Sequence, residues 1–390
     1  MSTRSPVFAQ IMQALDPTEF ARCAARFPAP RRPRSLSAYD HFLALCFGQL
    51  TWRESLRDLV ICLNARTARA YHLGLRSDIT RTNLAYANAH RDWRLFAEVA
   101  QLLMRRARRL YLTTTPTDPE LPALAYALDA SLIDLSLSLF PWAHWKERMA
   151  AMKLHTLLSL RGSIPAWCLV TEATCPEQIT LDQLPLEPGA FYVMDRGYLD
   201  FKRLKRLNQA AVYFVVRSKC HVRFRVLTSQ PVNKQIGLRC DQTISLTSSW
   251  SRHSFGGPLR RIRIRDAMTG QSLVLLTNHF ELPAQTIAHL YRSRWQVELF
   301  FKWIKQHLQL RGFYGRSPNA VRAQIWSAIC AYLLVAIARK ELRLSQSLHQ
   351  ILQIISVSAF EQTPLGELLA EKSPQENYTH APNQLSFNNI

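Results

Sequence analysis

The spacing of apolar residues divides the 390-residue chain into parts with different expected structures. Before residue 113, apolar positions recur at intervals of three and four, which is typical of helices with one buried face. This spacing predicts helices over residues 37–50, 53–63 and 84–110, and Thr80 or Asp78 could cap the last of them. Residues 1–112 are therefore expected to form a helical domain.

Strand-like alternation follows a turn-rich linker at residues 113–122, TTTPTDPELP. Apolar and polar residues then alternate with a period of two, as on a strand with one buried face. Strands are expected at residues 123–129, 133–140, 153–160, 166–173, 190–195 and 211–217, with a basic helix at 199–207. Strands that first follow one another and later alternate with helices predict a mixed α/β sheet flanked by helices.

A second strand-like stretch, residues 218–278, is rich in Thr, Ser, Gly and Arg. Its segment RRIRIRD alternates cleanly, with arginines on one face and isoleucines on the other. Helical spacing returns over residues 291–308, onward to residue 342, and over 348–360. We therefore expect a β-rich insertion at 218–278 within a domain of residues 123–345. A C-terminal helix and a polar, disordered tail are expected in residues 346–390.

Charge is the most informative property of the composition. The chain has 49 Lys and Arg against 28 Asp and Glu, a net charge of +21 and an isoelectric point near 10.1. Such an excess indicates a polyanionic partner, most commonly nucleic acid, although a generally basic soluble protein would share it.

The cysteines and the apolar runs indicate where the protein works. The eight cysteines are scattered without a CxxC pair, which argues against a zinc site or a disulfide framework and favours a reducing compartment. The first residues lack the apolar core of a signal peptide, and the longest apolar run, residues 325–338, is too short to span a bilayer. A cytoplasmic protein with no membrane partner is expected, and residues 325–338 are expected to form a core helix.

Residues 291–308, YRSRWQVELFFKWIKQHL, carry two adjacent stripes of a predicted helix. One is an ordinary buried stripe that spans roughly 60° of the helix: Leu290, Val297, Phe301, Ile304 and Leu308. The other spans roughly 80° and places one carboxylate among cations and a phenol: Tyr291, Arg294, Glu298, Lys302 and Lys305. Surface ion pairs worth about 0.3–0.5 kcal/mol each would explain the charges alone. A metal-binding acid flanked by phosphate-binding cations would also explain why the charged residues lie directly beside the apolar stripe.

Two further acids, Asp129 and Asp195, stand at the ends of predicted strands, ALAYALD and FYVMD, where Glu298 could meet them. Three carboxylates can hold two divalent cations roughly 3.5–4 Å apart, as in enzymes that cut phosphodiesters. Oxygen ligands favour Mg²⁺, with Mn²⁺ as a substitute, over zinc. An Asp at a strand end is also a common turn former or helix cap, so each acid alone leaves both interpretations open.

Four ordered motifs resemble one known family. Tyr291, Arg294, Glu298 and Lys305 stand as Y-x2-R-x3-E-x6-K, which is similar to the signature of DDE insertion-sequence transposases of the family-four type. FYVMDRGYLDF and ALDASLIDLSLSLFPWA resemble the motifs around that family's two aspartates, and LVLLTN and AQIWSAICAYLL are also typical of it. WRESLRDL and RTNLAYANAHRDW resemble its helical DNA-binding segment, and the resemblance covers roughly residues 7–345.

The resemblance implies a ribonuclease-H-like catalytic core that a β-rich insertion interrupts. It implies that Asp129, Asp195 and Glu298 bind two Mg²⁺ ions, which Mn²⁺ can replace. It assigns the cationic stripe to the DNA backbone near the cleaved end, through Tyr291, Arg294, Lys302 and Lys305. Trp250 in the insertion is the candidate for stacking on a base flipped out of the DNA. The sequence departs from the family pattern at Ala130, where a small hydroxyl residue is usual, and at Ser159, where an acid is common.

The same resemblance implies a bacterial, nucleoid-associated transposase that moves its own insertion sequence by a cut-and-paste reaction. Its partners would be double-stranded DNA, as terminal inverted repeats and as target, and a second copy of the chain in a homodimer that holds two ends. Two alternatives remain open. One is a domesticated or inactive transposase that only binds DNA; the other is a metal-dependent nuclease without strand transfer.

Overall fold

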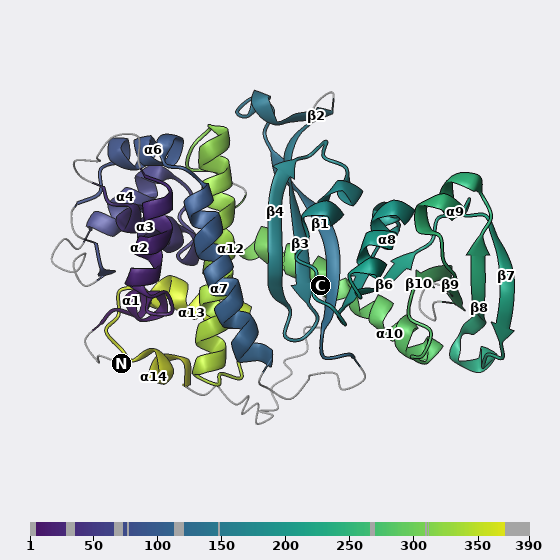
Figure 1. Ribbon diagram of the computed structural model, residues 1–390. Coiled ribbons are helices and arrows are strands. Elements are labelled where there is room, and N and C mark those ends of the chain that lie inside the picture. Colours follow the sequence, from purple (N-terminus) through teal and green to yellow (C-terminus); the bar gives the residue numbers. More distant parts are fainter. Residues whose placement is uncertain are drawn as a thin grey trace, which may run out of the picture.

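The computed structural model describes residues 5–28, 36–65, 73–75, 78–112, 121–146, 149–265, 270–308, 310 and 312–370. The predicted disordered tail and most of the predicted linker lie outside these residues. Figure 1 shows a body of helices at one side of the molecule and a long sheet that extends away from it.

The N-terminal part is helical, as its apolar spacing predicts. Its helices are α1 (Val7–Met12), α2 (Pro17–Arg26), α3 (Ala38–Leu50), α4 (Leu56–Asn64), α6 (Arg81–His90) and α7 (Arg94–Leu112). The predicted helix over 53–63 begins later than expected, because Ser55 caps α4 by accepting a hydrogen bond from the backbone N–H of Asp58. Thr80 caps α6 in the same way, with Asn83 as the donor.

The prediction of one helix over residues 84–110 is wrong, because the chain breaks between α6 and α7. Arg91 has an extended backbone (ψ 125°), and Asp92 Oδ1 accepts a hydrogen bond from the Arg94 backbone N–H at 2.9 Å. A side-chain acceptor at this place satisfies one of the free donors of a new helix, so α7 starts independently.

The centre of the protein is one mixed sheet. Its strands are β1 (Ala125–Leu135), β2 (His144–Lys146), β3 (Met149–Ser159), β4 (Ile164–Glu172), β5 (Phe191–Met194), β6 (Tyr213–Arg217), β7 (Phe224–Gln230), β8 (Leu238–Leu246), β9 (Leu259–Arg265) and β10 (Ser272–Thr277). They follow the order β2-β3-β1-β5-β6-β10-β9-β8-β7, with β4 paired to β3. β1, β5 and β6 run parallel, and the other pairs are antiparallel. The predicted mixed α/β sheet is thus confirmed.

The two strands predicted at residues 123–129 and 133–140 are in fact one strand, β1, followed by a turn. The alternation AYALDASLIDL continues through Asp129, and that residue pairs with Thr156 of β3. The chain turns only after Leu135, where the Phe140 backbone N–H donates to the Ser136 carbonyl at 2.9 Å. Asp129 therefore lies inside a strand, and the prediction that it ends one is wrong.

The strands of residues 218–278 continue the same sheet. β10 pairs with β6 on one side and with β9 on the other, and helix α9 (Ser249–Phe255) lies between β8 and β9 in the chain. The alternation in β9 is confirmed, because Ile262 and Ile264 are buried whereas Arg263 and Arg265 are exposed. Figure 1 shows β7, β8 and β9 at the end of the sheet farthest from the helical body.

The remaining helices are α8 (Phe201–Gln209), α10 (Ala284–Ser293), α11 (Trp295–His307), α12 (Pro318–Glu341), α13 (Leu348–Ser358) and α14 (Leu365–Ala370). The single helix predicted over 291–308 is two helices, because the bonds Arg294 N–H to Tyr291 O and Val297 N–H to Arg294 O have the tighter i to i−3 pattern. The apolar stripe of this segment is buried as predicted.

Helix α12 is the core helix that the apolar run predicts. Among the described residues it alone is long and apolar enough to cross a membrane, but 94% of its most apolar window is buried inside the protein. It packs on α7 and α3, and the C-terminal helices α13 and α14 pack on α1. The Val7 backbone N–H donates to the Glu361 carbonyl at 2.8 Å. The C-terminal helices thus join the N-terminal ones in a single helical body (Figure 1).

Candidate active site

Asp129 and Asp195 lie side by side where two parallel strands stop pairing. The last partners of β1 and β5 are Leu128 and Met194, so each aspartate directly follows a paired residue. Leu128 and Met194 both pack into an apolar core that also contains Leu204 of α8. Alternation turns the next residue of each strand to the opposite face of the sheet. Because neighbouring strands are about 4.8 Å apart, the two carboxylates start from adjacent positions on one face.

Arg294 joins Asp129 to Glu298. It occupies the junction between α10 and α11, with helical backbone angles (φ −52°, ψ −29°). Its Nη1 donates to Asp129 Oδ2 at 2.6 Å and its Nη2 to Glu298 Oε1 at 2.6 Å. Charge-assisted bonds of this length are among the stronger hydrogen bonds in proteins. The strand acid and the helix acid therefore lie within reach of one guanidinium group.

Tyr291 completes the connection to Asp195. Its hydroxyl donates to Asp195 Oδ1 at 2.9 Å, and Arg217 at the end of β6 approaches the same oxygen to 3.9 Å. The Arg294 guanidinium lies 5.8 Å from the centre of the Tyr291 ring. One turn of helix thus holds both strand acids, Asp129 through Arg294 and Asp195 through Tyr291.

The environment shifts the pKa values of these groups. Burial raises the pKa of Asp129 to about 6; the Arg294 charge opposes this shift, and the charges of Glu298 and Glu177 add to it. Burial and the Asp195 charge raise the pKa of Tyr291 to about 12. At neutral pH Asp129 is therefore mostly ionised and Tyr291 is a neutral donor.

A cavity of about 840 Å³ opens beside these acids. Asp129 and Glu298 line it together with Lys302 and Lys305, the two lysines of the predicted cationic stripe. Burial lowers the pKa of Lys305. Carboxylates at one end and cations along α11 would suit a ligand that carries phosphates and is cut at the carboxylate end.

The donor set fits a hard divalent cation, because Asp129, Asp195 and Glu298 offer only carboxylate oxygens at this place. As the side chains stand, the described residues contain no group of three or more His, Cys, Asp or Glu that could hold a metal ion. The Arg294 guanidinium lies between Asp129 and Glu298 and neutralises both of them. Binding of a cation by these two acids would therefore compete with Arg294.

Comparison with known proteins agrees with this chemistry. A family model described as a transposase DDE domain matches residues 121–334, which is more than half of the chain. The chain belongs to the DDE transposases. It is an enzyme of DNA transposition, which confirms the family and the activity that the motifs predict. The finer assignment to the family-four type stays a prediction. A second model, described as a domain of unknown function, matches residues 3–76.

Individual relatives carry the same description. A protein of Sinorhizobium fredii named as a transposase, y4zB, is 32% identical over 313 residues, which cover 78% of this chain and 85% of that one. A protein of Geobacillus stearothermophilus named as a transposase for the insertion sequence element IS5377 is 30% identical, over 61% of this chain and 64% of its own length. The structure of a piggyBac transposase synaptic complex with hairpin DNA covers 95% of this chain and 81% of its own, with 11% identity and a TM-score of 0.45. That structural similarity is too low to carry an argument.

Trp250 lies on the surface of the transposase, away from the first cavity. It is 65% exposed on α9, and its ring centre is 6.3 Å from that of Phe201. It lines a separate cavity of about 840 Å³ with Lys202 and Lys205 of α8. Trp250 is therefore not a core residue, and its stacking on a flipped base stays a prediction.

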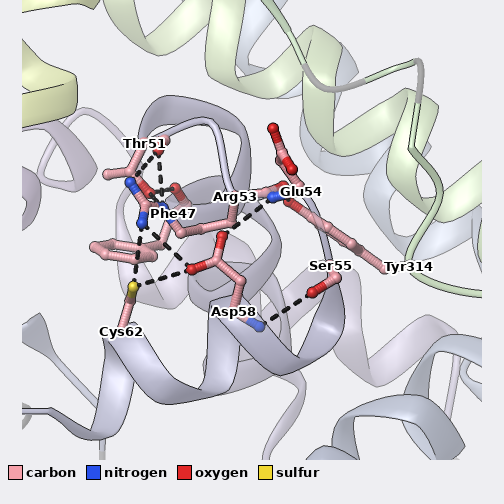
Figure 2. A network of polar contacts seen from close by, with 8 residues as sticks. All are labelled: Phe47, Thr51, Arg53, Glu54, Ser55, Asp58, Cys62 and Tyr314. Atoms are coloured by element: carbon pink, nitrogen blue, oxygen red, sulfur yellow. Dashed lines mark hydrogen bonds and ion pairs between the residues drawn. The ribbon is translucent and has the colours of Figure 1, made fainter.

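The N-terminal motif WRESLRDL contacts the catalytic part of the transposase. Trp52 Nε1 donates to the His307 carbonyl at the end of α11 at 2.9 Å, and the Tyr314 hydroxyl donates to the Arg53 carbonyl at 2.6 Å. Figure 2 shows Arg53 held in turn by Thr51 and Asp58. This motif therefore supports the far end of the helix that carries Glu298.

The second N-terminal motif, RTNLAYANAHRDW, has the same kind of contact. Asn319 at the start of α12 donates to the Asn88 and Arg91 carbonyls at 2.8 and 2.7 Å. Sequence reasoning assigned both motifs to DNA binding alone and missed this packing role. It also missed Arg217, which its place at the end of β6, beside the end of β5, could have indicated.

Proposed function

We propose that Asp129, Asp195 and Glu298 are the metal-binding acids with which this transposase cuts and joins DNA. The observation that carries the proposal is the single helical turn at Tyr291 and Arg294, which binds both strand acids and includes Glu298 in the same network. Such convergence is not expected of three unrelated surface acids.

The acids would hold two Mg²⁺ ions, with Mn²⁺ as a substitute, and the ions would stabilise the charge of the phosphodiester under attack. The protein's own contribution is to hold the acids in place and to bind the DNA backbone. Lys302 and Lys305 face the cavity and would bind phosphates near the cleaved end, together with Tyr291 and Arg294. Positioning and charge neutralisation supply most of the catalysis in such transfers.

The proposal extends to the fold and its partners. The order β4-β3-β1-β5-β6, with β3 antiparallel to β1, supports a ribonuclease-H-like core within residues 123–345, and residues 218–278 as its β-rich insertion. Residues 1–112 would bind DNA, and the C-terminal part expected at residues 346–390 would begin with α13 and α14. The net charge of +21 supports double-stranded DNA as the partner. A cut-and-paste reaction by a homodimer on terminal inverted repeats would follow.

The test is cleavage and joining of end-containing duplexes in MgCl₂ or MnCl₂. Asp129→Asn, Asp195→Asn and Glu298→Gln should each lower the cleavage rate at least about 100-fold, because each removes a metal ligand worth several kcal/mol. Glu172→Gln, an exposed acid at the end of β4, is the matched control and should leave the rate unchanged.

The same assay separates the alternatives. Specific binding of ends without cleavage by the unchanged protein in either metal would favour a DNA-binding role. Cleavage without joining of pre-cut ends to a plasmid would favour a nuclease. Full activity of Asp129→Asn would overturn the assignment of the acids.

A further inference from the structure

Glu177 reaches the active site from a part of the chain that none of the motifs includes. It opens the short 3₁₀ helix Glu177–Gln183, which follows β4, and packs on another short helix, Arg196–Tyr198, directly after Asp195. A Cβ atom on Gly197 would overlap the Glu177 Oε2 atom and lie 3.5 Å from Cδ. The backbone of Gly197 does not have a positive φ, so its conformation does not require glycine. A methyl group at residue 197 would instead displace the Glu177 carboxylate, which is the end of a flexible side chain.

The Glu177 side chain has no protein partner that would explain this position. Within the part of the chain that the structure describes, its carboxylate accepts no hydrogen bond and forms no ion pair. It is only half-buried, and its negative charge adds to that of Glu298 in raising the pKa of Asp129. Glu177 adds a fourth negative charge to those of Asp129, Asp195 and Glu298, and it has no ion-pair partner of its own among the described residues, so its position is unfavourable unless a further cation offsets it.

Tyr198 provides an independent observation at the same place. Its side chain is fully buried, yet its hydroxyl finds no hydrogen-bond partner among the described residues. The backbone N–H of Tyr198 donates to the Asp195 carbonyl at 3.1 Å, which anchors the residue beside the acids. Burial, followed by the charges of Asp129 and Glu177, raises the pKa of this phenol. A buried donor without an acceptor is rare in a native protein and points to a ligand.

We propose that Glu177 is a fourth carboxylate of the divalent-cation site and that the Tyr198 hydroxyl faces that site as a hydrogen-bond donor. The inference rests on the proposed metal-binding role of Asp129, Asp195 and Glu298. Carboxylate oxygens are the donors that Mg²⁺ and Mn²⁺ prefer, and additional ligand charge raises the affinity of such sites. A bound cation would offset the repulsion among the acids, and an oxygen ligand of that cation would accept a hydrogen bond from the Tyr198 hydroxyl.

Titration calorimetry of the intact protein with MnCl₂, without DNA, tests this inference. Glu177→Gln should weaken Mn²⁺ binding about 10-fold. Glu172→Gln makes the same change at an exposed site outside the acid cluster and should leave the affinity unchanged. Gly197→Ala should weaken binding as well, because the added methyl group takes the place of the carboxylate.

Tyr198→Phe separates a ligand-facing role from a packing role. It removes only the hydroxyl, so the metal-free protein should keep or gain stability as an unsatisfied polar atom disappears. Mn²⁺ affinity should fall about threefold, since one hydrogen bond near the cation is lost. A loss of stability without a change in Mn²⁺ affinity would indicate packing alone and count against the proposal.

The outcomes also separate this inference from the proposed function. If Asp129→Asn abolishes Mn²⁺ binding while Glu177→Gln binds as tightly as the unchanged protein, the fourth carboxylate is refuted and the three-acid site stands. If Asp129→Asn leaves Mn²⁺ binding intact, the proposed metal site itself fails. Should Glu177→Gln not fold, Glu177→Asp keeps the charge but shortens the reach, and unchanged affinity in that variant would refute the inference.

Discussion

Arg294 is the residue whose removal tests the description of the active site most directly. It donates one 2.6 Å hydrogen bond to Asp129 and another to Glu298. The side chains of Arg294, Asp129 and Glu298 are 14%, 19% and 32% exposed. Replacing Arg294 with Gln would leave two nearby carboxylates, one of them largely buried, without a counter-charge.

The expected loss of stability follows from this burial. Removing one partner of a buried ion pair costs about 3–5 kcal/mol, but partly exposed pairs cost much less because water screens the remaining charge. Since Glu298 is about one-third exposed, Arg294→Gln should lower the free energy of unfolding by about 2–4 kcal/mol in metal-free buffer.

Added MnCl₂ should restore part of this stability. The variant has no guanidinium group between Asp129 and Glu298, so a cation can bind there without displacing one. If the variant binds Mn²⁺ about tenfold more tightly than the unchanged protein, saturating metal stabilises it by about 1.4 kcal/mol more. The assay is urea unfolding followed by tryptophan fluorescence, with and without MnCl₂.

Arg260→Gln is the matched control. Arg260 forms a similarly buried pair with Asp241, through bonds of 2.8 and 2.7 Å, in the β8–β9 part of the sheet. That variant should also lose stability, but MnCl₂ should not restore it. Equal rescue of both variants, or a loss below about 1 kcal/mol in Arg294→Gln, would refute the argument.

Three further predictions concern other parts of the molecule. Lys305→Gln should weaken the binding of transposon-end DNA, measured by fluorescence anisotropy. It should also reduce the slope of log affinity against log salt concentration by about 0.9, because one phosphate contact is lost. An unchanged slope would exclude such a contact. Gly48→Ala should lower the free energy of unfolding by about 1–3 kcal/mol in urea, since the new Cβ would stand 2.5 Å from the Tyr314 hydroxyl oxygen; a neutral effect would show that Tyr314 moves away freely. His41 is fully buried and burial lowers its pKa to about 3, so its contribution to stability is complete above about pH 6.5 and is lost as the pH falls towards 3, because the unfolded chain takes up the proton first. When the pH falls from about 7.5 to 5, the free energy of unfolding of His41→Gln should therefore decrease by about 2 kcal/mol less than that of the unchanged protein. Equal decreases would contradict the lowered pKa.

The sequence by itself determined which parts of the chain are helical and which are strand-like, and the identity of the candidate acids. Helix and strand periods of 3.6 and 2 residues depend on local geometry, so they can be recognised without knowing which elements pack against each other. The buried stripe of residues 291–308, the alternation in RRIRIRD and the core helix at residues 325–338 were predictable for this reason. The excess of positive charge is likewise a property of composition alone.

Only the tertiary structure decided how these parts meet. Local alternation could not show that Asp129 lies inside β1, since this depends on its pairing with Thr156 of the separate strand β3. The breaks at Arg91 and Arg294 depend on where caps and partners stand in the fold. Glu177 had no detectable signal in the sequence, because its contact with Gly197 and its charge on Asp129 and Tyr198 arise only when the chain has folded. Periodicity encodes which face of an element is buried, whereas register and side-chain contacts between distant segments arise only when the chain has folded.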